Sequence, residues 1–369
     1  MQRAAAMVLV LSGLGVVSCR TDRAAKTTAR SPDLLAIEVA RQSARARADK
    51  ATDEVSVEVR KAALPIIEKE ADALRDGRRL LAMHRLSFAK PNFDALVYVR
   101  QRTASRPMDM AALKEEWARM GRVLKDELGR PAPGSLDGVQ PAAVRAIGEA
   151  ALPQVRLFYD ASLSYGENTQ PEIGLFYLGV AAAERDLVAF FRRLAAPASG
   201  RPPSLRPLDQ ELDRLESELL AAYRPPLSID RHPDFIAAGG ALKVARELDA
   251  AGLRHGALLQ YLQAATRTAL LRAAGGAPDA KPIALQLRAL ESRIASDAGV
   301  DHSLGRLFLE IAEDDLETAT AADGGPVKAA AIASEVMPRY FAALEPAAPR
   351  AAARPPARVT VTLVRWPFT

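Results

Sequence analysis

Apolar residues recur at intervals of three and four along almost the whole chain between residues 31 and 345. Leu287, Leu290 and Ile294 show this spacing in one segment. Side chains three and four positions apart lie on one face of an α-helix, so the pattern predicts amphipathic helices. The alternation typical of strands is clear only at 359–364, which reads Val-Thr-Val-Thr-Leu-Val. We therefore predict an all-α fold, an irregular array of antiparallel helical pairs, with a short extended C-terminal tail.

Proline and glycine mark where these helices should begin and end, because Pro lacks an amide hydrogen and Gly favours turns. Breaks are predicted at 90–92 (Lys-Pro-Asn), 105–107, 129–141, 197–203, 224–226 and 275–278. Pro65 and Pro153 lie within helical runs and are expected to kink or split them. Helix starts are predicted at Ser31-Pro32 and at Thr169-Gln170-Pro171-Glu172, a capping box. The chain then divides into an N-terminal helical region, 31–196, and a C-terminal one, 204–345.

The first 19 residues have the layout of a secretory signal. Met1-Gln2-Arg3 carries one positive charge, an apolar run follows from Ala4 to Val17, and Ser18 is small. The ending Val-Val-Ser-Cys at 16–19 resembles the lipobox of bacterial lipoproteins. The resemblance implies that residues 1–18 are removed and that Cys19 carries lipid. The alternative is an ordinary signal peptide with an incidental cysteine.

A lipid on Cys19 would determine where the protein resides. Residues 19–30 are polar and aperiodic, as expected of a tether between the lipid bilayer and the fold. The residue after Cys19 is Arg20 rather than Asp, which by resemblance to the bacterial sorting rule implies the outer membrane. We expect a lipid-anchored envelope protein that faces the periplasm. Because Cys19 is the only cysteine, internal disulfides and cysteine-ligated zinc are excluded.

The charge balance does not indicate a nucleic-acid partner. The chain has 50 basic and 45 acidic residues, a formal charge of +5, but the two signs alternate along the same segments. A nucleic-acid surface needs clustered cations, preferably with aromatic residues between them. The densest cluster is Arg41, Arg45, Arg47 and Lys50, just after the tether. It is typical of a solvated helix face, and the alternative is contact with anionic lipid headgroups.

One segment, at about 238–271, resembles a tetratricopeptide repeat. Its small positions are Ala245, Ala257 and Ala264, and its large ones include Leu248 and Tyr261. Ala241 replaces the usual Trp, and no second copy lies 34 residues away. The alternative is a generic pair of antiparallel helices with the same packing rule. In the repeat arrangement the first helix of the pair lines a concave surface, which directs Arg246 and Asp249 toward a bound partner.

Catalytic and metal-binding signals are weak. His84, His232, His255 and His302 are scattered: His84 lies on an apolar helical face, His232 is expected in a turn, and Asp301-His302 is expected to open a helix. No HExxH, phosphate loop or nucleophile elbow is present. The carboxylates Glu310, Glu313, Asp314 and Glu317 share one helical face, which we interpret as solvated, with divalent-cation binding as the alternative. We predict no catalytic residue, no metal and no cofactor.

The C-terminal segment, 346–369, combines a Pro-rich linker with an extended end that contains Trp366 and Phe368. Such an end either packs on the chain's own helices or adds as a strand to another protein, with these two aromatic residues as anchors. The sequence as a whole favours a non-enzymatic scaffold or adaptor that binds another envelope protein. The alternative is an enzyme or ligand-binding protein acting on cell-wall or carbohydrate material.

Overall fold

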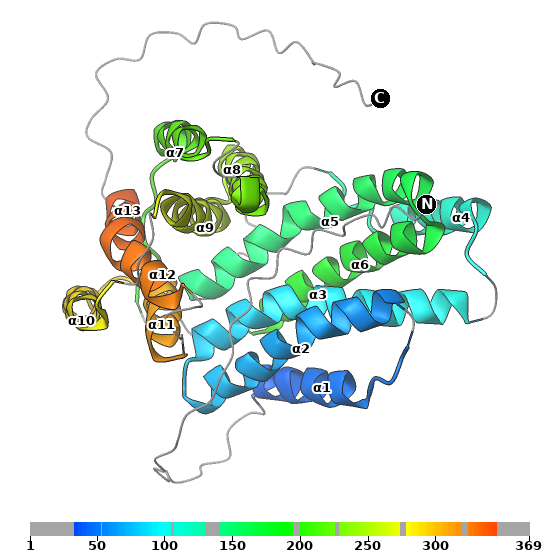
Figure 1. Cartoon of the computed structure of the whole chain (residues 1–369), viewed down its shortest axis with the longest axis horizontal. Helices are drawn as coiled ribbons and strands as arrows, with labels where there is room; N and C mark the ends of the chain where they lie inside the picture. The colour runs from blue at the N-terminus through cyan, green and yellow to red at the C-terminus, as the bar shows by residue number, and fades with distance from the viewer. Residues whose placement is uncertain are drawn as a thin grey trace, which may run out of the picture.

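The computed structural model describes residues 33–52, 54–104, 107–129, 141–194, 200–225, 229–273, 278–318 and 324–344. The chain is all-α and its helices pack largely in pairs, as the sequence predicts (Figure 1). The helices are α1 (Leu34–Ala48), α2 (Glu54–Arg75), α3 (Arg79–Thr103), α4 (Met110–Val123), α5 (Ala142–Asn168), α6 (Pro171–Arg193), α7 (Asp209–Ala222), η1 (Ile229–Arg231), α8 (His232–Ala250), α9 (Arg254–Arg272), α10 (Ala280–Ser296), α11 (Ser303–Thr318), α12 (Gly325–Ala331), η3 (Ile332–Val336, a π-helical turn) and α13 (Met337–Leu344). Within the described residues, β-structure is limited to an isolated bridge between Arg201 and Val300.

Three helical hairpins build most of the molecule: α2 with α3, α5 with α6, and α8 with α9. The hairpins join side by side because α3 packs on α6 and α5 packs on α9. Helix α9 also contacts α7, α12, η3 and α13, which places it at the centre of the C-terminal half. The largest apolar cluster draws on both halves, from Leu35 in α1 to Tyr340 in α13. The two predicted helical regions therefore share one core.

Small residues let the central helices approach closely. A Cβ on Gly179 of α6 would lie 2.9 Å from the Ala95 Cα in α3, and one on Gly174 would lie 2.6 Å from the Ser162 carbonyl oxygen in α5. Real Cβ atoms do not approach that near, so a larger residue at either position would push the helices apart. The apolar face of α6 then buries Phe176, Val180 and Phe191 against these neighbours.

One predicted break was wrong, and the two prolines predicted to kink or split their helices do not split them. Pro91 lies inside α3, so the predicted break at Lys90-Pro91-Asn92 does not exist, and neither Pro65 in α2 nor Pro153 in α5 splits its helix. A helix-interior Pro costs about 3 kcal/mol. Burial of the flanking Leu86 and Phe93, each worth about 1.5–3 kcal/mol, offsets that cost. The breaks at 105–107, 197–203, 224–226 and 275–278 do separate helices.

Two predicted helix starts are displaced by a residue or more. Helix α1 begins at Leu34 and is capped by Asp33, whose carboxylate accepts the amides of Leu35 and Ala36, so Ser31 is not its cap. Helix α6 begins at Pro171 after Gln170. The Thr169 hydroxyl instead donates to the Tyr165 carbonyl at the end of α5, so no capping box forms. The C-terminal end of α5 therefore binds the Thr169 side chain that was predicted to cap α6.

The pair predicted near 238–271 is formed by α8 and α9. Gly252 adopts a φ of 77° in the turn between them, a conformation that favours glycine. Ala245, Ala257 and Ala264 are fully buried, as the small positions of a close helical pair should be. Among the described helices, none is both long enough and apolar enough to cross a bilayer.

Candidate functional site

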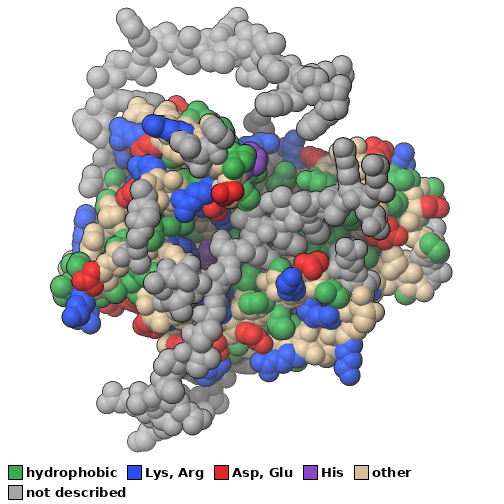
Figure 2. Space-filling model, in the orientation of Figure 1, with side chains coloured by type: hydrophobic (Ala, Val, Ile, Leu, Met, Phe, Trp, Pro, Cys, Tyr) green, Lys and Arg blue, Asp and Glu red, His purple; other side chains and the backbone are tan. Residues whose placement is uncertain are grey.

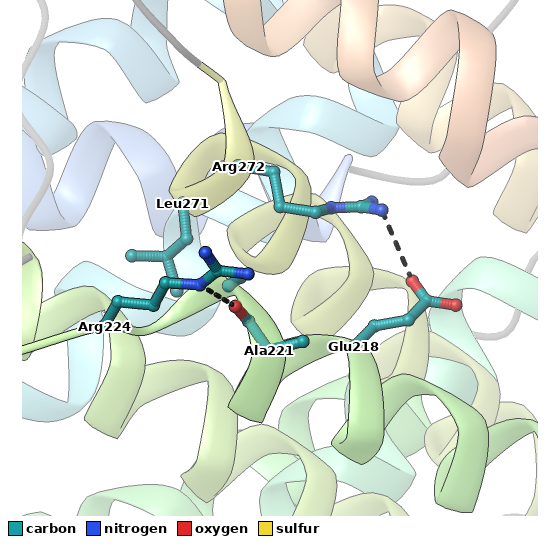
Figure 3. A pocket seen from close by; sticks show the side chains of 6 residues that line it. Glu218, Ala221, Arg224, Leu271 and Arg272 are labelled. Carbon is teal, nitrogen blue, oxygen red and sulfur yellow. Dashed lines mark hydrogen bonds and ion pairs between the residues drawn. The ribbon is translucent and has the colours of Figure 1, made fainter.

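A hollow of about 410 Å³ opens between the C-terminal ends of α7 and α9 (Figure 3). Its lining combines small apolar surface with charge and consists of Glu218, Ala221, Ala222, Arg224, Leu271 and Arg272. Arg272 reaches from α9 toward Glu218 on α7, while Arg224 turns back and donates to the Ala221 carbonyl oxygen at 3.2 Å.

The charges around this hollow are engaged with one another. Glu218 Oε2 lies 2.7 Å from Arg339 Nη2 and 3.7 Å from Arg272 Nη1. Arg272 also pairs with Glu335, and Arg339 donates to the Tyr261 hydroxyl at 3.0 Å. These bonds tie α7, α9, η3 and α13 together. The lining offers one carboxylate and two guanidinium groups, without a histidine, so it provides no acid–base pair for catalysis.

His302 has a carboxylate partner but lies in the interior. Its Nε2 is 3.0 Å from Asp297 Oδ2, and its Nδ1 is 2.9 Å from the Tyr340 hydroxyl. Both ring nitrogens are thus occupied, and only 6 % of the residue is exposed. Burial raises the pKa of Tyr340 above its ordinary value. This trio joins the end of α10 and the start of α11 to α13, and its exposed member is Asp297.

Two fully buried carboxylates, Asp301 and Glu149, accept backbone amides at the starts of other helices. Asp301 accepts the Ala142 amide at 2.7 Å and the Ser303 amide at 2.9 Å, so it caps α5 and α11 together. Glu149 accepts the Gly256 amide at the start of α9 at 2.7 Å and bonds Arg145. Burial raises the pKa of Glu149, and its two donors only partly oppose that rise. The sequence indicated Asp301 as a helix start, but not that it caps a second helix 159 residues away.

The other histidines lie apart from one another. His255 is buried at the start of α9, where burial lowers its pKa to about 4. His84 of α3 is half-buried, with its Nε2 3.0 Å from the Gln263 amide nitrogen. His232 is the first residue of α8 rather than part of a turn, and its Nδ1 is 2.8 Å from the Tyr223 hydroxyl. In the described part of the chain, no set of three or more His, Asp, Glu or Cys side chains could hold a metal ion.

The acidic face of α11 is solvated only in part, which corrects our interpretation: Asp314 is buried, Glu310 and Glu313 are half-buried, and Glu317 is exposed. Glu310 Oε2 accepts the Leu81 amide at 2.9 Å, and burial raises the pKa of Glu310 to about 7. Asp314 lies between Arg78, at 3.3 Å, and Arg85. Glu317 also pairs with Arg78. These carboxylates hold the start of α3, whose basic residues lie more than 220 positions away in the sequence.

The two predicted partner-binding residues of α8 contact α7. Arg246 Nη2 lies 3.0 Å from Asp213 and 2.7 Å from Glu216, with 37 % of its side chain exposed. Asp249 is half-buried, and its Oδ2 accepts the Leu208 amide at 3.0 Å. Their role toward a partner stays a prediction. Cys19, Trp366 and Phe368 lie outside the described residues.

The sequence did not reveal a polar layer between α1, α2 and α3. Lys90 Nζ lies 3.0 Å from Glu38 Oε1. Glu70 and Gln42 are almost fully buried, and none of their side-chain oxygens has a hydrogen-bond partner. Burial raises the pKa of Glu70 to about 8, and the nearby Glu38 charge adds to that rise. One signal was available: Glu70 continues the apolar spacing of Ala63 and Ile67 in α2.

Comparisons with known proteins provide no relative for this chain. No family model matches it, no curated protein matches it, and no solved structure matches it.

Proposed function

We propose that this chain is a lipid-anchored scaffold of the bacterial envelope, held in the outer membrane by acylated Cys19. Its helical body would face the periplasm and bind another envelope protein. The anchor rests on Val-Val-Ser-Cys at the end of an apolar run. One acyl chain binds a membrane only marginally, whereas the two or more chains typical of a lipoprotein anchor stably.

The observation that carries the scaffold proposal is that the buried charged side chains are bonded to other helices. Glu149 and Asp301 cap helices of other segments, and Asp314 bridges two arginines of α3. His302 is bonded on both ring nitrogens. Catalytic groups need access to a substrate, whereas these side chains are buried and bonded within the fold. Their common effect is to fix the relative positions of helices, which is what a rigid binding surface requires.

The C-terminal segment is the proposed recognition element, with Trp366 and Phe368 as its anchors. The test compares the full chain with a chain that ends at residue 356, both crosslinked in their own envelope. We expect a reproducible set of envelope proteins to crosslink to the full chain and to be lost from the truncated one. The melting temperature should change by about 1 °C or less, as expected if this segment serves recognition and not the stability of the body.

Two outcomes would contradict the proposal. Unchanged crosslinking after truncation, or a large loss of stability without loss of capture, would show that residues 357–369 are structural. Release of soluble fragments from cell-wall material by the purified full chain would show that the protein is an enzyme. A Cys19→Ala chain provides the control for crosslinks that depend only on membrane attachment.

A further inference from the structure

Helix α1 has an outward face of unusual composition. Its inner face buries Leu35, Glu38, Val39, Gln42 and Ala46. The outward face carries Leu34, Ile37, Ala40, Arg41, Ala44, Arg47 and Ala48, all of which are exposed. Ile37 exposes 52 % of its surface and Leu34 exposes 41 %. The only acidic residue of α1, Glu38, points inward, so the outward face combines apolar and basic side chains alone.

The position of α1 leaves this face uncovered by the other described helices. Helix α1 lies at the lower edge of the molecule in Figure 1, and its contacts are with α2 and α3. Lys and Arg side chains are visible along the same edge in Figure 2. Arg41 bonds the inward Glu38 at 2.7 Å yet keeps 56 % of its side chain exposed, and Arg45 reaches Asp94. Arg47 and Lys50 are exposed at the C-terminal end of the helix.

Only a short segment separates α1 from the proposed lipid. Fourteen residues, 19–32, precede Asp33. A flexible chain of that length has a root-mean-square span of about 20 Å, and fully extended it reaches about 50 Å. Acylated Cys19 would therefore keep α1 near the bilayer at a high effective concentration, where even a weak surface contact is populated. Apolar side chains flanked by cations are the composition that binds anionic lipid surfaces.

We propose that the outward face of α1 lies on the anionic headgroup surface of the membrane that holds Cys19, with Leu34 and Ile37 turned into the lipid and Arg41 and Arg47 at the phosphates. This inference rests on the proposed lipid anchor for its location. It adds that the body of the protein has a fixed orientation: α1 faces the membrane, and α7 and α8, at the opposite edge in Figure 1, face away.

The experiment uses chains that start at residue 19 and carry Cys19→Ser, so that acyl chains contribute nothing. Removal of the only cysteine lets a single environment-sensitive fluorophore be attached at Ile37→Cys or at Ile236→Cys. Ile236 of α8 is the matched control, since it exposes 53 % of its surface against 52 % for Ile37. Vesicles of phosphatidylethanolamine with about one-third phosphatidylglycerol, with and without brominated acyl chains, are then added.

We expect the label at residue 37 to brighten and to be quenched by brominated lipid, and the label at residue 236 to remain unchanged. Each basic residue near an anionic surface contributes about a fivefold change in partitioning, so Arg47→Glu should weaken binding about tenfold or more. Arg214→Glu, the same charge change at an exposed site of α7, should not weaken it. Raising the salt concentration from 0.05 to 0.5 M should also weaken binding, because screening shortens the range of the attraction.

Several results would overturn the inference. One is the absence of binding to anionic vesicles. Another is an equal fluorescence response of the labels at residues 37 and 236, and a third is equal weakening of vesicle binding by Arg47→Glu and Arg214→Glu. A response at residue 37 that grows with protein concentration in the absence of lipid would assign the face to a second copy of the chain. Acyl labelling of Cys19 in cells is a separate measurement. The absence of lipid on Cys19 can therefore be distinguished from the absence of membrane binding by α1.

Discussion

Glu70 is a buried carboxyl group whose surroundings offer it no hydrogen-bond partner. It is fully buried in α2, both carboxylate oxygens lack a hydrogen-bond partner, and burial raises its pKa to about 8 from 4.5. Arg85 and Lys90 lie near enough to oppose the rise, but Glu38 reinforces it. A carboxyl group in such a site binds a proton in the folded protein at pH values where the unfolded chain has lost it.

The pH dependence of stability follows from that difference. Between about pH 4.5 and pH 8 the folded state holds one more proton at Glu70, so stability falls as pH rises, by about 1.4 kcal/mol per unit. Glu70→Gln removes this contribution. We expect the variant to be more stable than the parent at pH 8 and close to it at pH 5, in chemical unfolding at both values. The exposed Glu68→Gln on the same helix is the control, and parallel pH profiles for parent and Glu70→Gln would contradict the interpretation.

Asp301 provides a second test among single residues. Because Asp301 caps α5 and α11 together, Asp301→Ala leaves the buried Ala142 amide and the part-buried Ser303 amide without this acceptor. One lost cap costs about 1 kcal/mol at an accessible site and up to 2 kcal/mol, so we expect a loss of about 2–4 kcal/mol in the free energy of unfolding. Asp109 caps only α4, through the Ala112 amide. Asp109→Ala should cost about 1 kcal/mol, and equal losses for the two variants would show that the double cap is not formed.

At the scale of helices, the sequence predicted well what depends on local spacing. The three-to-four periodicity predicted an all-α fold, and α8 and α9 form at the predicted pair. The failures involve partners that are distant in the sequence. Pro91 is tolerated because its neighbours are buried, and Glu310 is covered because α3 packs on α11. Likewise, the spacing of α2 could indicate that Glu70 is buried but not that it has no partner.

The close packing of helices can be tested with two Gly→Ala substitutions for which we expect stability changes of opposite sign. Gly179→Ala places a Cβ 2.9 Å from the Ala95 Cα, and overpacking of this kind costs about 1–3 kcal/mol. Gly239 lies within α8, and nothing lies within 4 Å of a Cβ built there. Gly239→Ala should therefore stabilise the protein by about 0.5–1 kcal/mol through helix propensity. Thermal unfolding would compare them, and a shift of the same sign in both variants would contradict the α3–α6 contact.

For the whole molecule, we propose that a lipid anchor holds an all-α body at the membrane. The body's buried charges fix helices against one another, the hollow between α7 and α9 lacks an acid–base pair, and the outward face of α1 is apolar and basic. These features fit a protein held at a membrane to present a surface. In our proposal, Cys19 gives each of them its location in the envelope.

The most direct test of that central claim is metabolic labelling with an acyl-chain analogue, followed by separation of membrane and soluble fractions, for the native chain and for Cys19→Ala. We expect the native chain to be labelled and to sediment with the outer membrane. We expect Cys19→Ala to be unlabelled and no longer held there, because the contact through α1 alone is weak. Equal labelling of both chains, or absence of label from the native chain, would contradict the lipid-anchored scaffold.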